Sequence, residues 1–154
     1  MFTMPFSVKI SSHRCKFSAS HFLFNHEKCS RLHGHNYDVQ LEIIGNLDEH
    51  FFVVDFFEVK KCVSEIVDNL DHAVLIAQES KFIKIAKEKG QIKVEFNQKH
   101  YEFPEVDVRL LPLPATTAEM LAKYLYDKLK PQFPQYKMKV EVGESEGSIA
   151  SYTE

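Results

Sequence analysis

The chain has 154 residues, a hydrophobic content of 44% and a formal net charge of -3, which together predict one soluble globular domain over residues 1–154. Such a small net charge gives no electrostatic reason to expect a nucleic acid or an anionic membrane as partner. No run of about 18 apolar residues occurs, and the start lacks the charged-then-apolar order of a signal peptide, so we expect a cytoplasmic protein with no membrane segment.

The amino-terminal third predicts two long antiparallel strands joined by a polar loop. Residues 6–20 alternate in part between apolar and polar positions, and residues 37–44 alternate again. His21 continues the apolar row of the first strand and is therefore expected to face the core. The connection over residues 24–32 is rich in His, Asn, Lys and Cys and predicts a loop.

A helix is predicted after this strand pair. Asp55 followed by Glu58 is typical of a helix cap and first turn, and apolar residues then recur every three or four positions to about Asn69. Residues 80–89 are basic and also predict a helix. Residues 91–103 alternate around a polar turn and predict a hairpin.

The carboxy-terminal part predicts a second long helix, over residues 118–130, with Thr116 or Thr117 as its cap and Pro131 at its end. The order β-β-α, inserted hairpin, α-β-β predicts an α+β fold, in which an antiparallel sheet carries the helices on one face. Pairing between subunits would cover the open edges of such a sheet. The remaining elements expected here are a proline-marked loop and two strands, at residues 110–114, 137–142 and 149–152.

Three histidines predict a metal site. His33 and His35 are two apart, so on a strand both side chains point to the same face, and His21 lies twelve residues upstream of His33. Three imidazoles suit zinc and leave a fourth position for water or substrate, as in catalytic sites. The alternatives are ordinary polar or core histidines, or a closed structural site in which Cys29 is a fourth ligand.

Cys29 is the candidate reactive thiol. It lies in the polar loop beside Lys28 and Arg31, and nearby cations favour a thiolate. Cys15 and Cys62 stand among apolar residues and are expected to pack as small hydrophobic side chains. Three cysteines are too few for a disulfide framework.

Two further positions carry candidate acid/base or binding groups. Asp71 precedes His72, and an aspartate that orients an imidazole is a common acid/base pair. Glu144 follows Gly143 near the end of a predicted strand, where its carboxylate would accept two N–H groups of a ligand. The alternative for His72 is an interaction with the end of a helix, and the alternative for Glu144 is a solvated charge in a turn.

These residues occur in an order that resembles one family. The chain is similar to the 6-pyruvoyltetrahydropterin synthase and 6-carboxytetrahydropterin synthase (QueD) family over nearly its whole length. The resemblance implies the tunnelling fold (T-fold), and trimers that stack as hexamers with active sites between subunits. It rests on Phe17-Ser-Ala-Ser-His21, Cys29-Ser-Arg-Leu-His33-Gly-His35-Asn-Tyr37, Val53-Val-Asp55-Phe56, Leu70-Asp71-His72 and Glu144.

The resemblance also implies the roles of individual residues. Cys29 would be the catalytic thiolate, with Asp71 and His72 as its acid/base partners. Glu144 would anchor the pterin ring. The zinc ligands would be His21, His33 and His35.

The stretch Thr116-Thr117-Ala-Glu119 resembles the family's segment that opens the second helix. Thr116 and Thr117 would therefore contribute to the pterin pocket, and helix capping alone is the alternative. Residues 77–113 are longer than the short bacterial pattern. That insertion would cover the site or extend an interface of the ring.

The implied reaction is a zinc-dependent conversion of 7,8-dihydroneopterin triphosphate to 6-carboxy-5,6,7,8-tetrahydropterin, on the route to queuosine. One alternative is the 6-pyruvoyltetrahydropterin synthase reaction, which eliminates triphosphate. Another is aldolase-like cleavage for folate synthesis, in which a glutamate replaces the cysteine, and Glu27 keeps this alternative open. A noncatalytic, zinc-stabilised pterin-binding oligomer is the alternative from another class.

Overall fold

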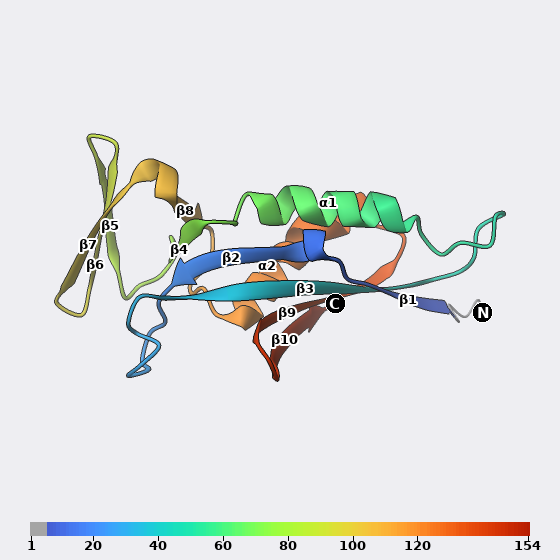
Figure 1. The fold of residues 1–154 in the computed structure, drawn as a ribbon, viewed down its shortest axis with the longest axis horizontal. Coiled ribbons are helices and arrows are strands. Elements are labelled where there is room, and N and C mark those ends of the chain that lie inside the picture. Colours follow the sequence, from blue (N-terminus) through green and yellow to red (C-terminus); the bar gives the residue numbers. More distant parts are fainter. Residues whose placement is uncertain (1–5) are drawn as a thin grey trace.

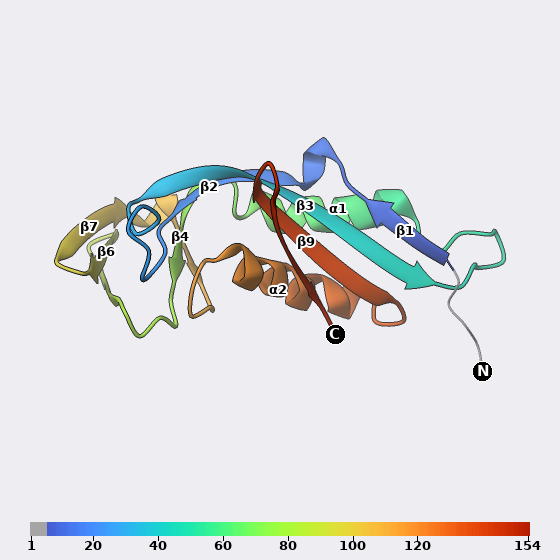
Figure 2. The same ribbon diagram turned by 90° about the horizontal axis from the view of Figure 1, so that it is seen from below.

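The computed structural model describes residues 6–154. Its large sheet has seven strands in the order β10-β9-β3-β2-β4-β8, with β1 paired to β3. The two long helices lie on one face of this sheet, and a small sheet stands at one end of the molecule (Figure 1, Figure 2). Residues 1–5 lie outside the described residues. The expected domain and the expected absence of a signal peptide both include these residues. The strands of the large sheet are β1 (Phe6–Ile10), β2 (Lys16–His21), β3 (His33–Gly45), β4 (Ala73–Ala77), β8 (Val108–Leu111), β9 (Lys137–Ser145) and β10 (Ser148–Thr153).

The long strand β3 organises the sheet. Tyr37, Val39 and Leu41 are each at most 1% exposed because they alternate toward the helices. β2 and β9 pair antiparallel with β3 on either side, and the β2 register sets His21 opposite His33. The predicted antiparallel pair is confirmed, as is the core-facing position of His21, which is 0% exposed.

Both predicted helix starts are confirmed. The Asp55 carboxylate accepts the N–H of Phe57 at 2.8 Å at the start of α1 (Phe56–Asp68). The Thr117 side chain caps α2 (Ala118–Leu129). Within residues 6–154, no helix is long and apolar enough to cross a membrane.

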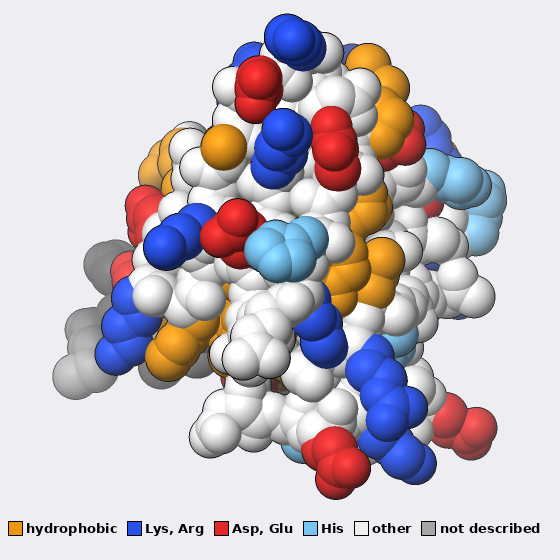
Figure 3. Space-filling view, turned by 90° about the vertical axis from the view of Figure 1, so that its left-hand side faces the viewer, with side chains coloured by type: hydrophobic (Ala, Val, Ile, Leu, Met, Phe, Trp, Pro, Cys, Tyr) orange, Lys and Arg blue, Asp and Glu red, His pale blue; other side chains and the backbone are white. Residues whose placement is uncertain are grey.

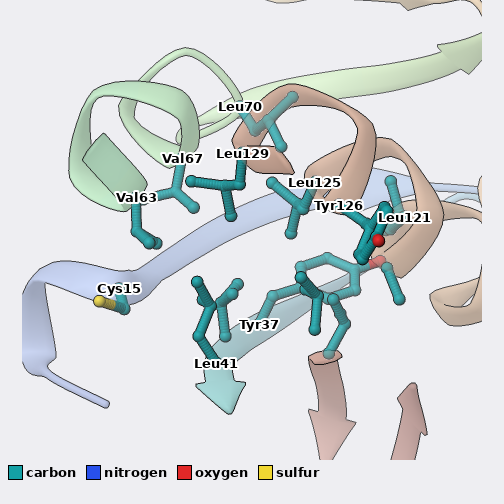
Figure 4. Close-up of a cluster of buried hydrophobic side chains, with 14 of the residues drawn as sticks. Cys15, Tyr37, Leu41, Val63, Val67, Leu70, Leu121, Leu125, Tyr126 and Leu129 are labelled. Carbon is teal, nitrogen blue, oxygen red and sulfur yellow. The ribbon is translucent and has the colours of Figure 1, made fainter. Parts of the chain in front are cut away.

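The main core lies between these helices and the sheet. Figure 4 shows Val63 and Val67 of α1, and Leu125 and Leu129 of α2, pointing toward the strands, where Leu41 lies. All five side chains are at most 1% exposed. The apolar face of each helix is therefore what attaches it to the sheet.

The small sheet contains the predicted hairpin, formed by β6 (Gln91–Phe96) and β7 (Lys99–Pro104), with β5 (Lys84–Glu88) added antiparallel to β6. The predicted helix over residues 80–89 is wrong. Ile83 and Ile85 of this segment pack against a second hydrophobic cluster, and residues 84–88 form a strand. Pairing with β6 therefore overrides the local helix preference.

The expectation of a wholly antiparallel sheet needs correction at one edge. β4 pairs parallel to β2, and β8 parallel to β4. β4 is a continuous apolar run, which is typical of parallel strands. It lacks the alternation of apolar and polar residues by which a strand is predicted from sequence. β8 overlaps the loop expected at residues 110–114, and a 3-10 turn at His13–Cys15 interrupts the first predicted strand.

Candidate metal centre and active site

Three histidines converge on the inner face of the sheet. His21 ends β2, and His33 and His35 begin β3, so strand pairing brings them together. One ring nitrogen of each lies within 4.8 Å of the others. The predicted same-face arrangement of His33 and His35 is therefore present, with the His21 ring beside them.

Backbone carbonyls orient two of these rings. Nδ1–H of His21 donates to the carbonyl of Thr116 at 2.9 Å, and Nδ1–H of His33 donates to the carbonyl of Arg31 at 2.6 Å. Both contacts leave Nε2 as the nitrogen with a lone pair, the usual arrangement around a ligating histidine. Burial lowers the pKa of His21 to about 4, so its ring is neutral at pH 7, the form that binds metal.

The donor set fits a divalent metal in an open site. Three neutral imidazoles suit zinc and neighbouring divalent ions. Among residues 6–154, the thiol of Cys29 does not belong to the close-packed group of ligand atoms. The geometry thus matches the open three-histidine arrangement rather than the closed one with a cysteine.

The Glu144 carboxylate lies beside the cluster. Its two oxygens are 3.9 Å from Nε2 of His21 and 4.0 Å from Nε2 of His35. The Glu144 side chain is 21% exposed, so it is not a solvated turn charge. It also lines a hollow of about 380 Å³ with Thr117 and Glu119 of α2.

The two threonines of the α2 start have different places. Thr116 is 2% exposed, and its carbonyl and hydroxyl both lie within hydrogen-bond distance of His21. Thr117 lines the hollow and caps α2. Glu119 also lines this hollow and is not among the site residues predicted from the sequence. An acidic residue in the first turn of a helix is common without any binding role, so its position gave no separate signal.

Asp71 and His72 form a hydrogen-bonded pair. Nδ1–H of His72 donates to Oδ2 of Asp71 at 2.8 Å, and Oδ1 of Asp71 accepts the N–H of Ser18 at 2.7 Å. The hydrogen bond from Ser18, with that from His72, lowers the pKa of Asp71. His72 has φ 58°, an uncommon conformation for a residue with a side chain, and its side chain is 84% exposed.

This pair does not share the hollow that Glu144 lines. His72 lines a second hollow, of about 530 Å³, together with Ser18, Ser20 and Asn36. Ser18 and Ser20 alternate with core-facing residues of β2 and therefore lie on the outer face of the sheet. A side chain at Gly34 would meet the carbonyl of Ala19 at 3.1 Å, so glycine keeps this part of the outer face open.

Cys29 lies in the connection between β2 and β3, residues 22–32, here called the Cys29 loop. It is half-buried, and its carbonyl accepts the N–H of Leu23 at 2.7 Å. Cys15 is 0% exposed, and burial raises the pKa of its thiol. Cys62 lies within α1 and packs against the main core.

The fold and these residues define an α+β protein in which three histidines, placed as the ligands of a metal ion would be, lie beside a carboxylate-lined hollow. Its family model is that of 6-pyruvoyl tetrahydropterin synthase, which matches residues 10–154. The chain belongs to the 6-pyruvoyltetrahydropterin synthase family and has its T-fold. It is therefore an enzyme, a lyase of this family, rather than a noncatalytic binding module.

Relatives and solved structures agree with this assignment. The chain is 34% identical over 157 residues to a putative 6-carboxy-5,6,7,8-tetrahydropterin synthase of Pyrococcus horikoshii, covering 98% of this chain and 94% of the relative. It is 36% identical over 115 residues to a protein of the same description from Methanocaldococcus jannaschii, covering 74% and 71%. A Plasmodium vivax 6-pyruvoyltetrahydropterin synthase with a catalytic glutamate replaced by alanine superposes with a TM-score of 0.90 at 25% identity, covering 97% of each chain.

Proposed function

We propose that this chain is a zinc-dependent lyase that converts 7,8-dihydroneopterin triphosphate to 6-carboxy-5,6,7,8-tetrahydropterin. The observation that carries the proposal is the cluster of His21, His33 and His35 with the Glu144 carboxylate within 4.0 Å of two of its rings. Its archaeal relatives carry the name of this reaction. The route to queuosine and a cytoplasmic location belong to the same proposal.

Substrate binding is assigned to the hollow beside the metal cluster. Glu144 and Glu119 are acceptors there for the N–H groups of a pterin ring, and Thr117 adds a hydroxyl. A hollow of about 380 Å³ is within the range of small-ligand sites. Thr116 acts on the substrate through His21, which it orients.

Proton transfer is assigned to two other groups of the chain. Cys29, as a thiolate, removes a proton from the substrate side chain, and His72 exchanges a proton through the ring nitrogen that Asp71 leaves free. Asp71 is ionised at neutral pH and fixes the His72 tautomer. Zinc held by the three histidines supplies Lewis-acid stabilisation of charge on a substrate oxygen.

The active site is proposed to be shared between subunits of a trimer-based hexamer. His72 and Glu144 line different hollows of the chain, and the proposed site combines Glu144 of one copy with His72 of a neighbouring copy. Four exposed phenylalanines around the start of α1, each at least 48% exposed, offer apolar surface of the kind that subunits cover. They are Phe51, Phe52, Phe56 and Phe57.

Two reactions of the same family are the competing proposals. Elimination of triphosphate to 6-pyruvoyltetrahydropterin is favoured by the names of the matched solved structures. Aldolase-like cleavage is favoured by Glu27, an exposed carboxylate two residues before Cys29, because the Plasmodium vivax relative has a catalytic glutamate.

The test is to incubate the purified, metal-analysed protein with 7,8-dihydroneopterin triphosphate and to identify the products by mass. We expect 6-carboxytetrahydropterin with acetaldehyde and inorganic triphosphate, formed with uptake of water, and at least about 10²-fold slower formation by a Cys29→Ala control. Release of 6-pyruvoyltetrahydropterin would assign the chain to the other synthase. Unchanged substrate in the presence of one bound zinc per chain would contradict the proposal.

A further inference from the structure

The Cys29 loop is closed by hydrogen bonds within itself. The N–H of Leu23 donates to the carbonyl of Cys29 at 2.7 Å, and the N–H of Cys29 donates to Nδ1 of His26 at 3.1 Å. The N–H of Ser30 donates to the carbonyl of His26 at 2.8 Å. The first of these bonds ties Cys29 to Leu23 at the start of the loop, so exchange of the Leu23 amide reports whether Cys29 stays in this position.

Aromatic packing ties the first part of this loop to the small sheet. Phe22 is 4% exposed and stacks on Phe96 of β6 and Tyr101 of β7, with ring centroids 5.3 and 5.4 Å away. Phe24 meets the edge of Phe96 at 5.3 Å. The residue directly after the candidate metal ligand His21 is therefore anchored in the second hydrophobic cluster.

One polar contact ties the second part of the loop to the same sheet. Nζ of Lys99, at the start of β7, donates to the carbonyl of Ser30 at 3.0 Å. The ammonium also lies 6.0 Å from the centre of the Phe96 ring, and the Lys99 side chain is half-buried. A hydrogen bond from a charged donor that is partly shielded from water is stronger than one on an open surface.

The views of the molecule agree with this arrangement. The Cys29 loop leaves the end of β2 on the side where β6 and β7 stand (Figure 1, Figure 2). Figure 3 looks onto this end, where lysine and arginine side chains are interspersed with acidic ones.

We propose that the small sheet sets the position of the Cys29 loop, and that Lys99 is the positioning residue that holds this loop through the Ser30 carbonyl. The part of the inference that concerns turnover rests on the proposed function. Losing the bond lets the Cys29 backbone sample positions away from the substrate, and small misplacement of a reacting group costs rate more than binding. The insertion between β4 and β8 is then a support of the active site.

The test compares Lys99→Met with Lys99→Arg and with Lys93→Met. Methionine keeps the packing on Phe96 and removes the donor, and arginine restores a donor. Lys93 is the matched control, because its ammonium binds Glu88 within the same sheet at 3.1 Å. For Lys99→Met we expect about tenfold faster hydrogen exchange of the Leu23 amide, about tenfold lower kcat, and KM and metal content within about twofold of wild type.

Arginine is expected to recover most of the loss, and Lys93→Met to behave as wild type. Unchanged Leu23 exchange in Lys99→Met would overturn the proposal, and so would an equal effect of Lys93→Met. Hydrogen exchange of the Leu23 amide does not depend on any substrate. If wild type fails to turn over the pterin, the proposed function fails, and this measurement still decides the role of Lys99.

Discussion

Cys29 is the residue on which the proposed chemistry depends most, and it stands apart from the three histidines. Replacement by alanine removes a proton acceptor without removing a metal ligand. We expect Cys29→Ala to lower kcat by about 10²-fold or more while zinc content and subunit assembly stay unchanged. Metal analysis and steady-state kinetics on the same sample check this. Loss of zinc from the variant would instead indicate a fourth ligand.

Asp71 links the His72 ring to the backbone of β2. In Asp71→Asn the amide oxygen still accepts the N–H of Ser18, but the amide nitrogen cannot accept Nδ1–H of His72. The variant is therefore expected to fold normally and to lose about 10²-fold in kcat, with less effect on KM. Ser18→Ala is the control, because it removes the Ser18 hydroxyl and keeps the backbone N–H that Asp71 accepts. Full activity of Asp71→Asn would show that the tautomer of His72 does not matter.

The lowered pKa of Asp71 also predicts a dependence of stability on pH. An aspartate whose native pKa lies below its unfolded value stabilises the folded state above about pH 4, and this contribution disappears as the pH falls through the native value. Wild type should therefore exceed Asp71→Asn in the free energy of unfolding at pH 7, and the difference should shrink in acid. Urea denaturation at several pH values measures it. A difference that grew toward low pH would contradict the assignment.

The start of α1 depends on one carboxylate. Asp55 accepts the backbone N–H groups of Phe57 and Glu58, which have no partner inside the helix. Asp55→Ala should lower the free energy of unfolding by about 1 kcal/mol, and the melting temperature by about 3 °C. Thermal denaturation checks this, and Asp55→Asn, which keeps an acceptor, should retain most of the stability. An unchanged melting temperature in the alanine variant would show that packing alone fixes this helix end.

The elements that alternate or begin with a cap could be predicted from the sequence, because each signal is local. β3, α1 and α2 are of this kind. β4 could not, since its run of five apolar residues has no period that separates a buried strand from other buried structure. β5 was mistaken for a helix because its partner β6, rather than its own composition, decides its conformation.

The candidate site also contains some features that follow from local sequence and others that depend on the fold. The convergence of His33 and His35 follows from spacing on one strand. The Asp71–His72 pair could be named from the sequence, but the positive φ of His72 is marked by no local pattern. The closeness of Glu144 to His21 depends on the pairing of β9 with β3, a contact between distant parts of the chain. Resemblance implies roles for single residues, which stay predictions, and only the fold shows how residues of different strands lie relative to one another.

His72 and Glu144 line different hollows, and we expect the oligomer, rather than one chain, to be the active unit. If each site takes Cys29 from one subunit and His72 from its neighbour, Cys29→Ala and His72→Ala are each inactive alone. Mixed in equal amounts and reassembled, they should recover about a quarter of wild-type activity, since one site in four combines both intact residues. Kinetics of the mixture, with each variant alone as control, measure this. No recovery after verified subunit exchange would place the whole site within one chain.

The parallel pairing of β4 with β8 also has a kinetic consequence. Parallel neighbours need a long connection, and here that connection contains β5, β6 and β7. Their antiparallel contacts join residues close in sequence, so they can form early and bring Ala77 and Val108 nearer before the edge of the large sheet closes. Refolding of this chain should therefore not be slowed in proportion to the length of its insertion, because that length folds into its own structure before the edge is built.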